Sequence, residues 1–370
     1  MFATRVTRLK QHLHDEGFSH AALVPGPNLR YFFGLSLHLS ERPIVVILSV
    51  EDERPLLIAP SFEIGKVEAS APAFAWRVYG YRDGQPFESA FHDAARALGG
   101  TRARIAVEAT RFRALEWSLL TRALPHAELV ATDAPFAALR QVKDEHEIAA
   151  LREAARRADE VLRALLEMLR PGMTEQQVAR KLLGLILDAE SEGVPFMPLV
   201  QSGPTAANPH AEAGARTLQS GDLVLLDFGL CIRGYMSDIT RTIALGEPLP
   251  ELRQAYEVVK AANEAACAAA KPGARAEEVD RAARAVIEQA GFGNYFTHRT
   301  GHGLGLEGHE APYIVAGNTA PLQPGMVFTI EPGIYLPGMG GVRIEDDVVI
   351  TQEGCERLTT FPRELLFLPG

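Results

Sequence analysis

Four acidic residues in the C-terminal part of this chain lie in sequence that otherwise predicts buried strands. Asp227 follows the apolar run Leu-Val-Leu-Leu, Glu331 follows Met-Val-Phe-Thr-Ile, and Glu345 lies shortly before Val-Val-Ile; Asp238 is the fourth acid. Removing an unpaired carboxylate from water is costly, so each of these side chains needs a partner. Four carboxylates cannot neutralise one another, whereas two divalent cations can, with the neutral imidazole of His302 completing the shell.

The first two acids lie 11 residues apart, on the expected arms of one strand pair. Asp227 belongs to the predicted strand 223–230 and Asp238 to the predicted strand 235–244. A hairpin places such residues side by side, about 5 Å apart at Cβ when they are directly opposite.

The expected ligand set consists of carboxylate oxygens and one imidazole. Such a set suits Mn²⁺, Co²⁺ or Zn²⁺ better than a metal that prefers thiolates.

The other two acids lie 14 residues apart on a second expected strand pair. Glu331 belongs to 326–335 and Glu345 to 341–350, and the loop between them is rich in proline and glycine. Arg343 precedes Glu345 by two residues, so the two side chains share a strand face. An arginine there can hydrogen-bond a carboxylate or a substrate.

A glycine-rich loop, 300–310, carries two histidines seven residues apart, His302 and His309. Its glycines let the backbone approach a centre closely. The loop formally contains GxGxxG, but Pro312 follows where a dinucleotide-binding fold would begin a helix. The zinc-peptidase pattern HExxH is also absent from this loop, because Tyr313 occupies the position of the second histidine.

Composition excludes several classes of function. The chain has 370 residues, 47% apolar and 23% charged, which indicates a soluble globular protein with room for two domains. A net charge of −10 without a basic tract argues against a nucleic-acid partner. The longest apolar runs are too short to span a bilayer, so we expect no membrane partner. Three cysteines, odd in number and far apart, indicate a reducing cytoplasm.

The pattern of expected elements changes near Arg140. Residues 1–140 alternate helix and strand, which predicts an α/β domain. Residues 141–370 have helices followed by strand pairs, twice over, which predicts an α+β domain around a strongly bent sheet. Within it, Thr174 opens a helix with a capping pattern, and we expect that helix to continue towards Glu192.

The C-terminal residues resemble the metallopeptidase family of prolidase, aminopeptidase P and methionine aminopeptidase. The resemblance covers roughly 143–370 and implies the pita-bread fold, in which two helix-plus-hairpin halves surround a bent antiparallel sheet. The N-terminal part is similar to the smaller domain of prolidases and aminopeptidase P through residues 28–34. The C-terminal resemblance is carried by Asp227, Ser237-Asp238-Ile239-Thr240-Arg241-Thr242, Gly301-His302-Gly303, Glu331-Pro332-Gly333-Ile334-Tyr335 and Gly341-Val342-Arg343-Ile344-Glu345-Asp346.

This resemblance implies two divalent metal ions in each subunit, with Mn²⁺ favoured over Co²⁺ and Zn²⁺. Asp227 would then bind one metal, and His302 and Glu331 the other. Asp238 and Glu345 would bridge both. A hydroxide held between the metals would attack the scissile carbonyl.

Further roles follow from the same resemblance. Glu331 would serve as general base and later as proton donor. His210 and His309 would contact the substrate and stabilise the developing charge. By itself His210 reads as a solvent-facing loop residue. Arg343 would orient Glu345.

The family implies cleavage of the Xaa-Pro bond in a small peptide with proline in second position, and a cytoplasmic homodimer. We favour an Xaa-Pro dipeptidase, with aminopeptidase P as the alternative. Many prolidases carry an arginine four residues after the second histidine, where this chain has Tyr313. The substrate carboxylate would then need Arg299, or His38 or Arg42 of the partner subunit.

Three other readings are weaker. A methionine aminopeptidase is usually shorter and lacks a domain such as 1–140. A creatinase-like C–N hydrolase or a non-catalytic binding protein shares the fold but typically loses part of the metal-binding set. All five candidate ligands are present here.

Overall fold

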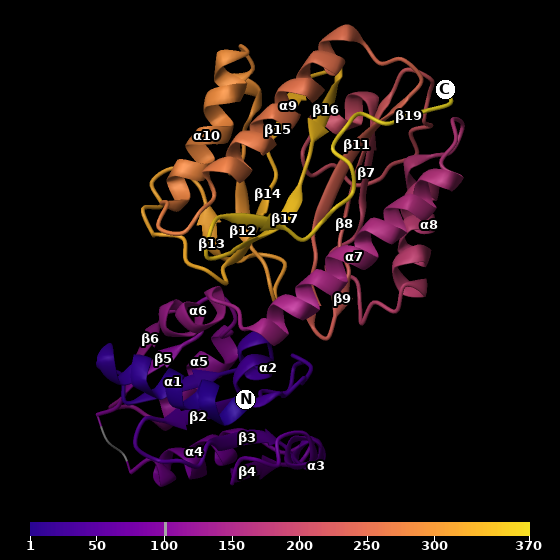
Figure 1. The fold of residues 1–370 in the computed structure, drawn as a ribbon. Helices are drawn as coiled ribbons and strands as arrows, with labels where there is room; N and C mark the ends of the chain where they lie inside the picture. Colours follow the sequence, from indigo (N-terminus) through magenta and orange to yellow (C-terminus); the bar gives the residue numbers. More distant parts are fainter. Residues whose placement is uncertain (100–101) are drawn as a thin grey trace. The chain divides into compact units, whose positions relative to one another are not determined.

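The computed structural model describes residues 1–99 and 102–370. The chain forms two compact units, Met1–Arg140 and Gln141–Gly370 (Figure 1). Within these described ranges, no helix is both long and apolar enough to cross a membrane.

The N-terminal unit is built on one mixed sheet of six strands in the order β4-β3-β2-β1-β5-β6. The neighbours of β1 differ in direction, because β1 runs antiparallel to β2 and parallel to β5. The residues of β1 are all buried, as expected for a central strand covered on both faces. The strands are β1 (His20–Leu23), β2 (Val45–Ser49), β3 (Leu56–Pro60), β4 (Arg77–Tyr81), β5 (Arg104–Val107) and β6 (Glu128–Ala131).

Helices alternate with these strands, which confirms the expected α/β character of this unit. The apolar faces of α4 and α5 pack with the sheet into one core. The helices are α1 (Phe2–Asp15), α2 (Pro27–Phe33), α3 (Ser61–Ser70), α4 (Glu88–Ala97), α5 (Ala114–Ala123) and α6 (Ala134–Gln141).

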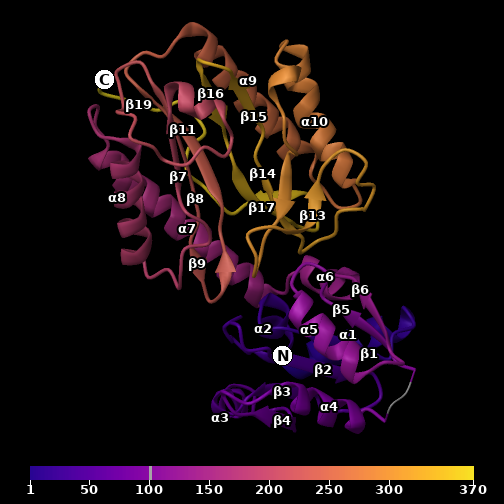
Figure 2. The same cartoon turned by 180° about the vertical axis from the view of Figure 1, so that it is seen from behind.

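Two pairs of long helices frame the C-terminal unit (Figures 1 and 2). The first pair is α7 (Glu145–Met168) and α8 (Glu175–Asp188), and the second is α9 (Pro250–Ala269) and α10 (Ala276–Gln289). The predicted cap of α8 is confirmed, because the side chain of Thr174 accepts a hydrogen bond from the backbone of Gln177 and the reverse bond is also made. The helix ends at Asp188, before the expected Glu192.

Each helix pair packs against its own group of strands. One core joins α7 and α8 to a sheet ordered β19-β11-β8-β7, and a second core joins α9 and α10 to a sheet ordered β13-β12-β14-β17-β18. An isolated bridge between Thr240 and Glu345 connects the two halves. The expected α+β pita-bread architecture is confirmed.

The remaining elements of this unit are short. They are β7 (Leu199–Ser202), η1 (Gly203–Ala207), β8 (Leu223–Phe228), β9 (Cys231–Ile232), β10 (Tyr235–Met236), β11 (Ile239–Leu245), η2 (Gly293–Tyr295), β12 (Gly301–Gly303), β13 (Glu310–Ile314), β14 (Val327–Ile330), β15 (Gly333–Leu336), β16 (Gly340–Arg343), β17 (Asp346–Ile350), β18 (Cys355–Arg357) and β19 (Phe367–Leu368).

Both expected strand pairs are interrupted where the acids lie. In the first, β8 pairs with β11 only from Ile239 onward, and β9 and β10 form a separate hairpin. Gly229 allows this turn, because a Cβ there would lie 1.9 Å from the carbonyl oxygen of Ser237. In the second, the ladder breaks at Glu331-Pro332, where proline has no N–H to donate.

Candidate metal centre

The five candidate ligands converge on one cavity of the C-terminal unit, with a volume of about 790 Å³. Ligand atoms of Asp238, His302 and Glu345 all lie within 4.8 Å of one another. The carboxylate of Glu331 approaches the same imidazole, with Oε1 3.4 Å from His302 Nε2. Asp227 is also buried and lines the same cavity.

Strand register decides which acids meet. Thr240, rather than Asp238, lies directly opposite Asp227, so the two aspartates are diagonal neighbours on one face. On the second pair, Ile330 is paired with Asp346 and Gly333 with Arg343. Continuing that register brings Glu331 opposite Glu345.

Backbone and hydroxyl groups fix the bridging region. Thr240 Oγ1 donates to Glu345 Oε2 at 2.6 Å, and the amide of Glu345 donates to the Thr240 carbonyl at 3.1 Å. The amide of Asp238 donates to Asp347 Oδ2 at 3.0 Å. These bonds hold the two acids while leaving other carboxylate oxygens facing the cavity.

Arg343 is fully enclosed beside this cluster. Its Nη2 donates to Asp227 Oδ2 at 2.5 Å, and its Nε donates to Thr240 Oγ1 at 3.1 Å. Arg343 therefore contacts Asp227 directly and reaches Glu345 through Thr240, whereas the resemblance implied that it orients Glu345.

The imidazole of His302 presents a lone pair to the carboxylates. Its Nδ1 lies 3.1 Å from the carbonyl oxygen of Gly303, which assigns the proton to Nδ1. Burial lowers the pKa of His302 to about 3, so the ring is neutral. Its Nε2 then faces Glu331 Oε1 at 3.4 Å and Asp238 Oδ2 at 3.9 Å. Such an arrangement is repulsive unless a cation or a proton lies between these atoms.

The carboxylates themselves also fit a cation. Burial, followed by the charge of Asp227, raises the pKa of Glu331 to about 7, although Arg343 opposes the shift. Burial and neighbouring carboxylates also raise the pKa of Asp238 and of Glu345. Among the described residues, Oδ1 of Asp227 and Oδ1 of Asp238 are buried without a hydrogen-bond partner. Divalent cations would satisfy these oxygens and offset the mutual repulsion.

Polar side chains from two loops line the mouth of the cavity. The ring of His309 lies 3.9 Å from that of His302, centroid to centroid. Arg299 Nη2 lies 3.2 Å from His309 Nδ1, and its guanidinium covers the ring of Tyr313 at 4.6 Å. His210, an exposed residue after η1, lines the same cavity.

Sequence reasoning missed part of this site. His298 also lines the cavity, with Nδ1 2.8 Å from the Arg299 carbonyl and Nε2 2.8 Å from the Tyr335 hydroxyl. Burial lowers the pKa of His298 to about 4, so Tyr335 donates to Nε2 and accepts from Arg343 Nη1. His298 carried no recognisable signal, because it precedes the glycine-rich loop in a stretch without periodicity.

Family models match both parts of the chain. Residues 149–352 match metallopeptidase family M24, and residues 5–142 match the creatinase/prolidase N-terminal domain. The chain belongs to metallopeptidase family M24. Membership in this family implies divalent metal ions, in agreement with the donor set of the cavity.

Relatives and solved structures cover the full chain. The probable dipeptidase PepE of Mycobacterium tuberculosis is 39% identical over 100% of this chain and 97% of its own length. The Xaa-Pro dipeptidase of Lactobacillus delbrueckii subsp. lactis is 37% identical, covering 98% of each protein. The crystal structure of the prolidase from Thermococcus sibiricus has a TM-score of 0.94 and 36% identity, covering 100% of this chain and 99% of that one.

Proposed function

We propose that this chain is an Xaa-Pro dipeptidase that uses two divalent metal ions, with Mn²⁺ favoured over Co²⁺ and Zn²⁺. The observation that carries the proposal is the cluster in which Asp238, Glu345 and Glu331 approach the imidazole of His302, with Asp227 lining the same cavity. The relatives named as dipeptidases and the prolidase neighbour support the substrate class.

In this proposal each metal has its own ligands and two shared ones. Asp227 would hold one ion, and His302 and Glu331 would hold the other. Asp238 and Glu345 would serve both ions. The ions would supply Lewis-acid activation of water and of the scissile carbonyl.

The side chains around the ions handle protons and charge. Glu331 accepts the proton of the attacking water and later donates a proton to the leaving nitrogen. His210 and His309, at the cavity mouth, hold the substrate carbonyl as negative charge develops. Arg343 keeps Asp227 in place through its short hydrogen bond.

The proposed proline specificity follows because the cavity requires no N–H group from the scissile bond. The Xaa-Pro bond is a tertiary amide and offers no N–H. The apolar side chains of Pro195, Phe196 and Leu199 line one part of the cavity. A five-membered ring can contact these groups without leaving a hydrogen-bond donor unsatisfied.

Arg299 supports a preference for dipeptides. Its guanidinium lies in the cavity wall, stacked on Tyr313 at the position where many prolidases carry their own arginine. A planar fork there can bind the free carboxylate of a bound dipeptide. Arg42 of the partner subunit is a weaker candidate for binding this carboxylate, because the Arg42 guanidinium already donates two hydrogen bonds to Asp83.

Peptide selectivity tests this proposal. The Mn²⁺-loaded protein should cleave Met-Pro and Ala-Pro faster than the matching Xaa-Pro-Yaa tripeptides. Met-Pro amide, which lacks the carboxylate, should be a poor substrate for the unaltered protein. Arg299→Gln should raise KM for Met-Pro and not for Met-Pro amide, whereas Arg281→Gln, on the exposed face of α10, should change neither.

Preferential cleavage of tripeptides would instead assign the chain as an aminopeptidase P, the second candidate. Tyr313, in place of the prolidase arginine, favours this alternative.

The amount of bound metal separates the remaining alternatives. About two equivalents of Mn²⁺ per chain are expected, while none would indicate a binding protein without catalysis. Cleavage of creatine-like C–N bonds without Xaa-Pro cleavage would indicate a creatinase-like hydrolase.

We also infer a homodimer, since the N-terminal unit resembles a domain that closes the partner's site in similar enzymes. A cytoplasmic location is inferred from the three cysteines, which are odd in number and far apart. Sedimentation equilibrium should give about twice the chain mass of 40.2 kDa. A monomer at assay concentrations, with full activity, would remove this part of the proposal.

A further inference from the structure

The two segments that carry Glu331 and Glu345 lack one backbone hydrogen-bond donor. The amide of Ile344 donates to the carbonyl of Pro332 across 3.5 Å. Pro332 has no N–H, so it cannot return the bond to the carbonyl of Ile344. The ladder is therefore incomplete beside both glutamates.

Asn263, on α9, supplies a donor at this position. Its side chain is fully buried. Nδ2 donates to the carbonyl of Ile344 at 3.2 Å and to the carbonyl of Ile330 at 3.0 Å. These carbonyls belong to the residues immediately before Glu345 and Glu331, so one amide group ties together the backbones that present both acids.

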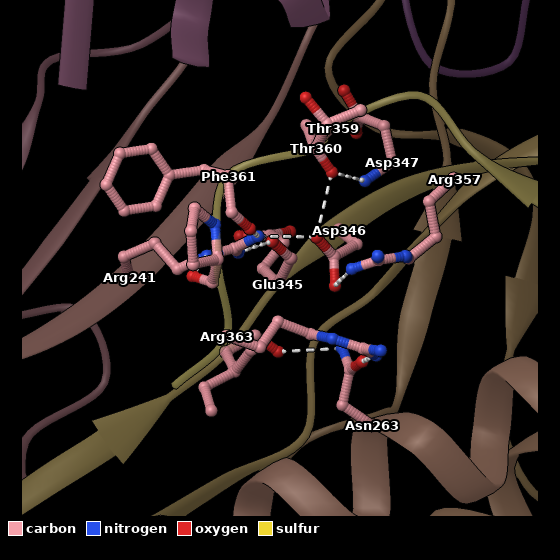
Figure 3. A network of polar contacts seen from close by, with 12 residues as sticks. Arg241, Asn263, Glu345, Asp346, Asp347, Arg357, Thr359, Thr360, Phe361 and Arg363 are labelled. Atoms are coloured by element: carbon pink, nitrogen blue, oxygen red, sulfur yellow. Dashed lines mark hydrogen bonds and ion pairs between the residues drawn. The ribbon is translucent and has the colours of Figure 1, made fainter. Parts of the chain in front are cut away.

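The orientation of this amide is fixed by a neighbouring arginine. Arg363 Nη1 donates to Asn263 Oδ1 at 2.5 Å, and Cys267 Sγ lies 3.8 Å from the same oxygen. A guanidinium only donates hydrogen bonds, so it must face the amide oxygen, and the NH₂ group must face the two carbonyls. Figure 3 shows Asn263 with Arg363 below the network around Glu345.

We propose that Asn263 is a positioning residue that sets the separation of Glu331 and Glu345 and thereby tunes metal binding. The inference rests on the proposed metal site. A structural role alone would lower stability and leave metal affinity unchanged. A positioning role predicts a loss of affinity, because ligand oxygens must lie within about 0.2 Å of their ideal places.

Two substitutions separate these roles. Asn263→Asp keeps an oxygen for Arg363 but presents a second oxygen, instead of a donor, to the two carbonyls. Asn263→Ala removes the amide altogether. Val259→Ala is the matched control, since Val259 is fully buried one turn earlier on the same helix and packs in the same core.

Metal binding is measured directly rather than through activity. Mn²⁺ is titrated calorimetrically into metal-free protein, and Co²⁺ binding is followed by visible absorption. Both Asn263 variants should bind Mn²⁺ about 10–100-fold more weakly, the range found when residues behind metal ligands are altered. Their Co²⁺ spectra should also change. Val259→Ala should lower Tm with unchanged affinity and spectrum.

The outcomes distinguish this inference from the proposed function. If the unaltered protein binds no Mn²⁺, the metal site itself fails. If it binds Mn²⁺ and both Asn263 variants bind equally well with the same Co²⁺ spectrum, the positioning role is overturned.

A second pair of variants applies if the Asn263 variants do not fold. Arg363 is partly exposed, with 17% of its side chain accessible, so its replacement should be tolerated. Arg363→Met frees the amide to turn and should weaken Mn²⁺ binding severalfold. Arg363→Lys keeps a donor and should restore it. If Arg363→Met and Arg363→Lys both bind Mn²⁺ as tightly as the unaltered protein, the proposal is overturned.

Discussion

Thr240 and Glu345 are joined by two hydrogen bonds, one through the side chains and one through the backbone. Thr240 Oγ1 donates to Glu345 Oε2 at 2.6 Å, and the Glu345 amide donates to the Thr240 carbonyl at 3.1 Å. The two residues belong to different halves of the C-terminal unit, and Thr240 also accepts from Arg343 Nε. A single hydroxyl thus links a carboxylate, an arginine and both halves of the fold.

Thr240→Val should weaken this link without changing the size of the side chain. The valine leaves a buried carboxylate oxygen and Arg343 Nε without their partner, which should cost about 1–3 kcal/mol of unfolding free energy. Mn²⁺ affinity should fall about tenfold, because the orientation of Glu345 is no longer fixed. Urea unfolding and metal titration measure the two effects, and Thr240→Ser should recover both. Unchanged affinity in the valine variant would show that the hydroxyl does not orient Glu345.

Asp238→Asn should abolish turnover and raise the thermal stability of the metal-free protein. In metal-free protein, burial of the Asp238 carboxylate, followed by the charges of Glu345 and Asp227, raises its pKa. Removing one charge relieves that repulsion, so the Tm of the metal-free variant at pH 8 should rise by roughly 2–4 °C, the shift that about 1 kcal/mol gives. Turnover should disappear with Mn²⁺ present, and so it should in Asp238→Ala. Full activity in either variant would contradict the metal assignment.

Metal removal should destabilise the C-terminal unit. A ligand present at 100 times its Kd stabilises the folded state by about 2.7 kcal/mol. Thermal scans with EDTA and with excess Mn²⁺ should therefore differ by roughly 5–10 °C at pH 8. The difference should be much smaller in Asp238→Ala, which lacks a shared ligand. Equal Tm values in the unaltered protein would argue against a structural contribution of the ions.

Glu108 should make the N-terminal unit less stable as pH rises. Burial raises the pKa of Glu108 to about 7, despite hydrogen bonds from the Val24 amide and from Asn28 Nδ2. Between about pH 4.5 and 7 the folded state holds more protons at Glu108 than the unfolded state, so the contribution of Glu108 to stability is fully present below pH 4.5 and is lost as pH rises towards 7. The contribution lost is about 3 kcal/mol.

Tryptophan fluorescence can follow this change, because Trp76 and Trp117, the two tryptophans of the chain, both belong to the N-terminal unit. Urea unfolding of the unaltered protein should show the loss between pH 5 and 7.5. Glu108→Gln cannot ionise and should flatten that part of the profile. The same pH profile in both proteins would assign the effect to other groups.

Local sequence was enough to predict most of the long elements. Thr174 and Gln177 satisfy each other's backbone groups within one turn, so the cap of α8 could be predicted without any tertiary contact. The five candidate ligands were recognisable for a related reason. A carboxylate such as Asp227 or Glu331 at the end of an apolar run is costly wherever the chain folds, so it demands a partner.

The contacts among these residues depend on long-range packing. The pairing of Thr240 with Asp227, the contact of Arg343 with Asp227, and the place of His298 depend on registers and loop paths that link distant segments. Asn263 shows most clearly which contacts could not be predicted from the sequence. It is one of several polar residues on the alanine-rich helix α9, and only packing brings its amide to the carbonyls of Ile330 and Ile344. Local sequence therefore identifies the polar groups that need a partner in the interior, whereas the three-dimensional arrangement of distant backbone segments places the groups that serve as those partners.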